Sequence, residues 1–246
     1  MKRCVVITGS DGGIGRELVS CFKRHSIHVI GLDHHSETES DCDEYIAVDL
    51  SNVAAIDRGE GKFVDALLGA IRGKQLIGLI NNAALQLLGP FEDLQVDQWE
   101  RVMRVNLLAP VTLSRILLNS LTAGSGSIFN IASVHANLTK PNFSAYATSK
   151  AALVGLSKAM AVEIGDRVRV MCLCPAAIDT ELLRLGFGLD EKRYEKLLDF
   201  HPSKSIGDPK SVAELVAFFI LRADRFVNGL VLNYDGGISW RLHDPE

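Results

Sequence analysis

The sequence of 246 residues lacks an excess of positive charge, a framework of paired cysteines and an apolar run long enough to cross a bilayer. Its 30 aspartates and glutamates outnumber its 26 lysines and arginines, so it carries no basic footprint for nucleic acid. Five cysteines without regular spacing favour reduced thiols and a cytoplasmic location. Because the first predicted strand begins almost at Met1, we expect no signal peptide. The charge balance and the lack of a long apolar run predict no nucleic-acid partner and no membrane contact.

Short apolar runs alternate along the chain with segments of helical periodicity. The predicted strands are Cys4–Thr8, His28–Leu32, Tyr45–Val48, Leu76–Asn81, Ser127–Ile131, Val168–Leu173 and Leu230–Asn233. The predicted helices are Gly13–Arg24, Phe63–Arg72, Val96–Leu118, Ala145–Ile164 and Pro209–Leu221, the last capped by Asp208. Since most runs lack polar alternation, the strands are expected to be parallel and covered on both faces. The pattern predicts one α/β domain over residues 1–246, a Rossmann-type, doubly wound sheet of seven mainly parallel strands in three αβα layers.

The link between the second and third predicted strands is unusually short. Only sixteen positions run from His34 to Asp49, and these include the third strand itself. A crossover helix needs about a dozen residues in addition to its turns. This acidic link is therefore predicted to be a loop or a single turn.

A glycine cluster, TGSDGGIG, follows the first predicted strand and opens the first predicted helix. Gly9, Gly13 and Gly15 do not have the G-x-G-x-x-G spacing, and no Lys-Ser or Lys-Thr follows as in a triphosphate loop. The strand–loop–helix context still suits a pyrophosphate, because Gly9 and Gly13 let the backbone approach while the helix N-terminus binds the anion. Gly15 is expected to let the helix pack close to the sheet. On this motif alone, a glycine-rich turn without a ligand is the alternative.

Asp33 closes the second predicted strand about twenty residues beyond the glycine cluster. A carboxylate at that place accepts hydrogen bonds from both ribose hydroxyls and repels a 2′-phosphate. Asp11 and Gly12 offer no basic side chain to pair with such a phosphate, so NAD is predicted rather than NADP. A strand-end cap is the alternative for Asp33. His34 and His35 follow, but no ligand set with metal spacing joins them, and no metal is expected.

Tyr146 and Lys150 are spaced so that they share one face of a helix, one turn apart. A free phenol, with a pKa near 10, is a poor base at neutral pH, and a neighbouring cation favours its ionised form. Ser133, thirteen positions before the tyrosine, ends a predicted strand and can hydrogen-bond a reacting oxygen. The three residues together predict proton transfer at a hydroxyl or carbonyl group.

With these residues in place, the sequence resembles the classical short-chain dehydrogenase/reductase family over nearly the whole chain. The shared marks are TGSDGGIG, Asp33, Asp49-Leu50, Asn81-Asn82-Ala83-Ala84, Asn106 in VNLLAP, Ser133, YATSK from Tyr146 to Lys150, the segment from Pro175 to Thr180, and LNYDGG. Two departures are Ala84 and Ala176, where the family usually has glycine. The first adds a methyl group beside the cofactor pocket, and the second is expected to stiffen the loop on the nicotinamide side.

The resemblance implies hydride transfer between NAD and a secondary alcohol or ketone. Tyr146 would be the general acid/base, and Lys150 would lower its pKa and bind the nicotinamide ribose. Ser133 would orient the substrate oxygen, while Asn106 would hold a water in a proton relay that ends at Lys150.

The resemblance also implies the binding residues. The expected cofactor contacts are Gly9, Asp11, Gly12, Gly13, Ile14, Gly15, Asp33, Asp49, Leu50, Asn82, Ala83, Tyr146, Lys150, Pro175, Ile178 and Thr180. Asp49 and Leu50 would flank the adenine, Asn82 and Ala83 the ribose, and Ile178 and Thr180 the carboxamide. The candidate substrate contacts by position are Leu85, Gln86, Ser133, His135, Phe143 and Leu182.

The segment 176–205 is expected to cover the substrate as a lid, although an amphipathic surface cover is nearly as good an interpretation. The long helices predicted at Val96–Leu118 and Ala145–Ile164 are where family members pair, which implies a homodimer or homotetramer. Two other functions remain open. One is a 3-oxoacyl-thioester reductase, which normally uses NADPH, and the other is a regulatory protein that senses NAD without catalysis.

Overall fold

Seven parallel strands form one sheet in the computed structural model, which describes residues 1–60, 62–181, 183–184 and 191–242. The strand order is β3-β2-β1-β4-β5-β6-β7, and every pairing is parallel. The strands are β1 (Lys2–Thr8), β2 (His28–Asp33), β3 (Glu44–Ala47), β4 (Lys74–Asn81), β5 (Ser127–Ile131), β6 (Arg169–Pro175) and β7 (Val231–Tyr234). The predicted doubly wound, Rossmann-type sheet is confirmed.

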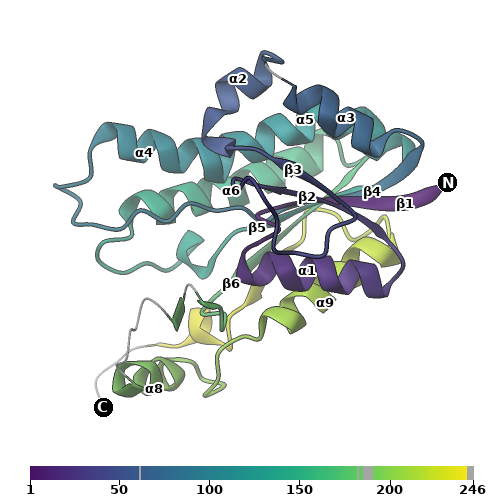
Figure 1. Ribbon diagram of the computed structural model, residues 1–246. Helices are drawn as coiled ribbons and strands as arrows, with labels where there is room; N and C mark the ends of the chain where they lie inside the picture. The colour runs from purple at the N-terminus through teal and green to yellow at the C-terminus, as the bar shows by residue number, and fades with distance from the viewer. Residues whose placement is uncertain (61, 182, 185–190, 243–246) are drawn as a thin grey trace.

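Helices cover both faces of this sheet and make three layers (Figure 1). On one face lie α1 (Gly13–Arg24) and α9 (Pro209–Arg222), side by side; on the other lie α3 (Phe63–Ile71), α5 (Ala109–Ala123) and α6 (Ser144–Glu163). The remaining α-helices are α2 (Val53–Asp57), α4 (Val96–Met103) and α8 (Glu191–Phe200), and short 3₁₀ turns are η1 (Leu50–Asn52), η3 (Val134–Ala136) and η4 (Ile238–Trp240). No helix in the described part of the chain has the length and apolar content needed to cross a membrane.

The side-chain alternation of β1 explains why both faces are apolar. Val5 and Ile7 belong to the core under α1 and α9, whereas Cys4 and Val6 belong to the core under α3 and α5. Successive side chains of a strand point to opposite faces, so a strand covered on both sides is apolar at every position. This produces the unbroken run CVVI in the sequence.

The link between β2 and β3 contains no helix over residues 34–43, as the short interval predicted. The helix predicted from Val96 to Leu118 is instead divided into α4 and α5 by a π-helical turn, η2 (Arg104–Leu108). A π-turn holds one more residue than an α-turn, and sequence periodicity does not reveal it. Asn106, one of the predicted catalytic residues, lies in this turn and is fully buried.

The sheet has its topological switch point between β1 and β4. From β1 the chain continues to β2 on one side, whereas from β4 it continues to β5 on the other. In a doubly wound sheet the crevice outside the carboxyl ends of such neighbouring strands is the usual ligand site. The glycine cluster and Ser133 follow the carboxyl ends of strands and Asp33 is the last residue of one, so the fold brings them to one edge.

Candidate functional site

The glycine loop after β1 is a close-packed turn in which side chains have little space. Gly9 has φ of +66°, and a Cβ built there would lie 2.9 Å from the Cα of Ala83. A Cβ on Gly13 would lie 2.7 Å from Cγ2 of Thr180, and one on Gly15 would overlap the carbonyl oxygen of Gly9. Gly15 thus lets α1 approach the loop itself rather than the sheet, which corrects the predicted contact. The bare backbone at the N-terminus of α1 fits a pyrophosphate group.

Asp33 ends β2 with a buried carboxylate that already has partners. Its Oδ2 accepts a hydrogen bond from the main-chain nitrogen of Asp11 at 3.0 Å. Its Oδ1 is 2.7 Å from the main-chain nitrogen of His34 and 2.8 Å from the ring Nδ1 of the same residue. His34 was not predicted as a site residue, and nothing in its spacing could have indicated that its ring caps this carboxylate.

One group of potential metal ligands surrounds the same carboxylate. Asp33, His34 and His35 each bring one ligand atom to within 4.8 Å of the others, but both histidines are exposed. The hydrogen bond from His34 to Asp33 and the 3.9 Å separation of the two imidazole rings account for this grouping.

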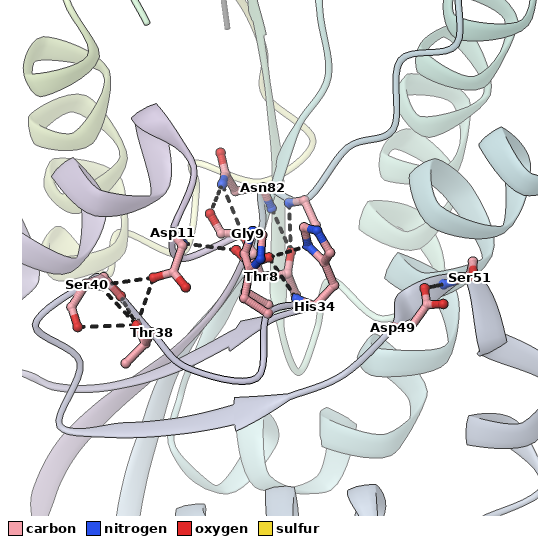
Figure 2. A network of polar contacts seen from close by, with 12 residues as sticks. Thr8, Gly9, Asp11, His34, Thr38, Ser40, Asp49, Ser51 and Asn82 are labelled. Carbon is pink, nitrogen blue, oxygen red and sulfur yellow. Dashed lines mark hydrogen bonds and ion pairs between the residues drawn. The ribbon is translucent and has the colours of Figure 1, made fainter. Parts of the chain in front are cut away.

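Asp49 and Leu50 follow β3, at the predicted adenine side. Oδ1 of Asp49 accepts a hydrogen bond from the nitrogen of Ser51 at 2.9 Å, and Figure 2 shows this pair apart from the glycine loop. Burial would raise the pKa of Asp49, but the Ser51 hydrogen bonds and the charge of Arg101 lower it below its usual value. The side chain of Leu50 is buried in the core, which leaves its main chain for any adenine contact.

Asn82 and Ala83 join the end of β4 to the glycine loop. Nδ2 of Asn82 donates to the carbonyl oxygens of Thr8 and Gly9, at 3.1 and 2.9 Å. The main-chain nitrogens of Asn82 and Ala83 both donate to Oγ1 of Thr8, at 3.0 and 2.9 Å. Thr8 is a further site residue that the spacing did not single out, and it fixes the loop against β4. Because Ala84, the departure from the family pattern, has no positive φ, its methyl group causes no backbone strain.

Pro175 is the last residue of β6, and Ile178 and Thr180 lie in the segment that follows it. The main-chain nitrogen of Thr180 donates to the oxygen of Ile178 at 2.8 Å, and its side chain faces Gly13. Ala176, the second departure, donates from its nitrogen to Tyr234 at 3.0 Å and also has no positive φ. Alanine therefore fits there as well.

Ser133, Tyr146 and Lys150 meet where β5 ends beside α6. Ser133 lies close enough to the phenol of Tyr146 to lower its pKa, and the Ser133 Oγ accepts a hydrogen bond from the nitrogen of His135 at 3.2 Å. Lys150 is 2% exposed; its Nζ donates to the carbonyl oxygen of Ile131 at 2.8 Å and lies 5.7 Å from the centroid of the Tyr146 ring. The structure thus brings Ser133, Tyr146 and Lys150 together. The hydroxyls of Ser133 and Tyr146 are neighbours, and the ammonium of Lys150 lies one helical turn from Tyr146.

The protein shifts the pKa values of this group in directions that the spacing did not predict. Burial raises the pKa of Tyr146 to about 12, and its hydrogen bond with Ser133 only partly opposes this. Burial also lowers the pKa of Lys150 to about 8, while the thiols of Cys172 and Cys174 act the other way. In the protein alone burial dominates, because Nζ of Lys150 donates to the carbonyl oxygen of Ile131; a lowering of the tyrosine pKa by Lys150 stays a prediction for the complex with cofactor.

Asn106 has its side chain fully engaged within the protein. Its Oδ1 accepts from the nitrogen of Leu85 at 2.7 Å, and its Nδ2 donates to the oxygen of Leu85 and to Oγ of Ser149, both at 2.9 Å. Ser149 in turn donates to the carbonyl oxygen of Tyr146 at 2.7 Å. A water held by Asn106 would have to use its main chain. Ser149, which no motif singled out, links α6 to the π-turn.

The candidate substrate residues form an aromatic group beside the phenol. The rings of His135 and Phe143 are stacked with centroids 4.4 Å apart, and the His135 ring stands edge-on to Tyr146 at 5.9 Å. Burial and the charge of Lys140 lower the pKa of His135 to about 4, so its imidazole is neutral near pH 7. Among the other candidates, Leu85 is half-buried, Gln86 is exposed and Leu182 lies outside the described residues.

Lys150→Met is expected to raise the free energy of unfolding by about 1–2 kcal/mol at pH 7 and to abolish turnover. The folded-state pKa of about 8 lies below the ordinary 10.5, so protonation of Lys150 costs stability at any pH below 8. This cost decreases as the pH rises from 8 to 10.5. The increase in the free energy of unfolding that Lys150→Met causes should therefore become smaller over that interval. The lost hydrogen bond to Ile131 reduces the gain.

Urea unfolding at pH 7 and pH 10 measures this effect. Lys158→Met, which removes an exposed lysine from the same helix, is the matched control and should change stability little. Equal stability of the Lys150 variant and the wild-type chain at pH 7 would contradict the expectation.

The amino-acid sequence is similar to a family model and to known proteins over almost its whole length. The family model described as enoyl-(acyl carrier protein) reductase matches residues 9–239. The chain is 32% identical over 251 residues to 2-keto-3-deoxy-L-fuconate dehydrogenase of Xanthomonas campestris, covering 97% of this chain and 80% of that one. It is 26% identical over 248 residues to dehydrogenase/reductase SDR family member 4 of Pongo abelii, covering 98% and 89%. The chain belongs to the short-chain dehydrogenase/reductase family.

Solved structures of short-chain dehydrogenases superimpose closely on this fold. Aldohexose dehydrogenase of Thermoplasma acidophilum has a TM-score of 0.87 and 31% identity, with 100% of this chain and 98% of that one covered. A 4-hydroxyisoleucine dehydrogenase in complex with NADH has a TM-score of 0.87 and 30% identity, covering 98% and 100%. A protein of Beutenbergia cavernae assigned as an NAD(P)-dependent gluconate 5-dehydrogenase, with NADP bound, has a TM-score of 0.84 and 28% identity, covering 97% of each chain. As a member of this family, the chain is an oxidoreductase with a nicotinamide-cofactor fold.

Proposed function

We propose that this short-chain dehydrogenase uses NAD to transfer a hydride between the nicotinamide and a secondary alcohol or ketone. The observation that carries the proposal is the meeting of Ser133, Tyr146 and Lys150 at the strand edge that also holds the glycine loop. A phenol and a neighbouring serine hydroxyl are suited to bind one substrate oxygen, and the bare backbone at Gly9 and Gly13 suits the pyrophosphate.

In the proposed reaction the chain's own groups manage the proton. Ser133 would donate a hydrogen bond that orients the substrate oxygen, while the Tyr146 phenol takes or gives the hydroxyl proton. Lys150 would hold the nicotinamide ribose, and a water on the main chain of Asn106 would connect the lysine to solvent. When bound, the nicotinamide supplies the hydride acceptor and a positive charge, which opposes the burial that raises the pKa of Tyr146.

The remaining binding residues would follow the same arrangement. Asp49 and the main chain of Leu50 would contact the adenine, and Ile178 and Thr180 would lie at the carboxamide. Residues 1–246 would act as one catalytic domain, with the segment 176–205 as the substrate cover. We further propose a cytoplasmic homodimer or homotetramer, paired through the helices α4, α5 and α6. Val96 on α4 and Leu108 on the π-turn between α4 and α5 are exposed apolar residues.

The direct test is a screen of secondary alcohols, sugars and hydroxysteroids with NAD and with NADP, followed through the nicotinamide absorbance. Turnover with NAD that is lost in Tyr146→Phe supports the proposal. NAD binding without turnover of any of these substrates would favour the regulatory alternative. The 3-oxoacyl-thioester reductase alternative would show itself as NADPH-dependent reduction of such thioesters, and Asp33 argues against it.

Asp33→Ala combined with Gly12→Arg is expected to shift the ratio of kcat/KM for NAD over NADP by about 100-fold or more toward NADP. Removing the carboxylate ends its repulsion of the 2′-phosphate, and the arginine can pair with that group. The arginine fits, because a Cβ on Gly12 meets only the oxygen of Gly9, at 3.4 Å. Gly12→Gln with Asp33 unchanged tests whether bulk alone has an effect. An unchanged ratio in the double variant would remove Asp33 from the ribose site.

A further inference from the structure

The end of β2 carries three possible metal ligands on consecutive residues. Asp33, His34 and His35 each bring one ligand atom, a carboxylate oxygen or an imidazole nitrogen, to within 4.8 Å of the others. Among the described residues, no other group of three histidine, cysteine or acidic side chains is brought this close together. Two imidazoles and one carboxylate are a donor set that suits zinc and similar divalent ions, whereas magnesium and calcium prefer oxygen ligands.

Hydrogen bonds hold the carboxylate of this group in a fixed orientation. Oδ2 of Asp33 accepts from the main-chain nitrogen of Asp11 at 3.0 Å, and Oδ1 accepts from the main-chain nitrogen of His34 at 2.7 Å. A carboxylate oxygen has two acceptor positions, and the second position of Oδ1 faces the His34 ring, whose Nδ1 is 2.8 Å away. Carboxylates that bind metals usually receive such hydrogen bonds from groups outside the ligand set.

The two imidazole rings can adjust their positions to an ion. The side chain of His34 is 66% exposed and His35 is also exposed, so both rings can turn without disturbing the core. Ligand atoms around a tetrahedral zinc ion lie about 3.3 Å apart, a distance that small rotations of these rings can reach. The phenol of Tyr45 donates to the main-chain oxygen of His35 at 2.7 Å, which holds the chain in place.

The charges around the three residues favour a cation. The carboxylate of Asp11 is buried beside Asp33, and Figure 2 shows it turned toward Thr38, whose hydroxyl is a neutral donor. Burial and the negative charges of Asp11 and Asp33 raise the pKa of Tyr45 to about 12. The negative potential of the two carboxylates therefore extends to the residue that holds the main chain of His35.

We propose that Asp33, His34 and His35 bind a divalent ion of the zinc type, and that this ion and the adenosine ribose of NAD exclude each other. The ion would bind Oδ1 of Asp33 and one nitrogen of each ring, and a water would complete the tetrahedron. At His34 it would replace the proton between Nδ1 and Asp33, and the neutral ring would carry its proton on Nε2. Spacing along the chain predicted no metal, because it does not show that the His34 ring turns back onto Asp33.

The ion would inhibit the enzyme by competing with the cofactor and not with the substrate, since ion and ribose both need the Asp33 carboxylate. This competition rests on the proposed NAD-dependent function, whereas the metal site itself does not. Binding of the ion can therefore be measured on the chain alone, without any substrate.

Calorimetric titration of zinc chloride into the untagged, metal-free chain tests the site. We expect one ion per chain, and His34→Ala and His35→Ala should each weaken its binding by about tenfold or more, because each removes one of three ligands. His25→Ala removes an exposed histidine that follows α1 and is the matched control, with an expected change in Kd of less than twofold. Magnesium chloride at the same concentrations should show no binding.

Titration of NAD in the presence of zinc tests the competition. With zinc at about ten times its Kd, the apparent Kd for NAD should rise about tenfold, and in His35→Ala the same zinc concentration should have little effect. Zinc binding that neither histidine variant weakens would overturn the site. Zinc binding that leaves the affinity for NAD unchanged would overturn the shared use of Asp33. A metal-free chain that does not bind NAD would instead contradict the proposed function, and the zinc titration would still decide on the site.

Discussion

Tyr146→Phe is expected to lower kcat by about 1000-fold or more and to leave the Kd for NAD within about twofold of the wild-type value. The substitution removes only the hydroxyl that exchanges the proton. The ring keeps its edge-on contacts with His135 and Phe143, whose centroids lie 5.9 and 6.3 Å away. Because burial already disfavours the phenolate, the folded chain should tolerate phenylalanine and unfold at the same urea concentration or a higher one.

The matched control is Tyr234→Phe, which removes a phenol hydroxyl at the end of β7 and should retain most of the activity. Rates and NAD affinities of both variants are measured with a substrate identified in the screen. If Tyr146→Phe keeps more than about a tenth of the wild-type kcat, the phenol is not the acid/base. If Tyr146→Phe loses NAD binding, the hydroxyl serves the cofactor site and the proposed division of roles fails.

The fold and the proximity of the candidate catalytic residues could be predicted because local patterns determine them. Tyr146 and Lys150 share a helix face at a fixed spacing, and Ser133 follows a strand that is buried at every position. Parallel strands then place their carboxyl ends on one edge, so the sequence order of the motifs is enough to bring them to a common crevice.

Contacts between distant segments could not be predicted in the same way. Thr38 reaches Asp11 across 27 positions, and Asn106 reaches Ser149 across 43. Neither contact has a periodic signature, since loops and π-turns depend on the packing around them. The burial that raises the pKa of Tyr146 is likewise a product of packing around the helix, and the spacing of Tyr146 and Lys150 does not report it. Spacing reports which residues are neighbours, whereas the pKa depends on how far each one is removed from water.

Substitutions in the glycine loop can show whether its glycines are needed for folding or only for binding a ligand. Gly15→Ala should destabilise the chain by more than about 4 kcal/mol, a size that single substitutions rarely reach. A Cβ at this helical position would overlap the carbonyl oxygen of Gly9, which is backbone and cannot rotate away as a side chain can. Gly9 has a positive φ and packs closely against Ala83, so its backbone cannot move away from the added methyl group.

Gly12→Ala is the matched control within the same loop. Its Cβ would meet the same carbonyl oxygen at 3.4 Å, an ordinary contact, and φ there is −73°. We expect a loss of at most about 1 kcal/mol, because alanine is a poorer residue than glycine at the N-terminal cap of a helix. Urea unfolding of both variants checks the difference. Wild-type stability in Gly15→Ala, with only NAD binding lost, would mean that the loop can open and that the ligand alone requires glycine there. A large loss confined to Gly15→Ala would mean that the close approach of α1 to the glycine loop requires the third glycine, whether or not a dinucleotide is bound.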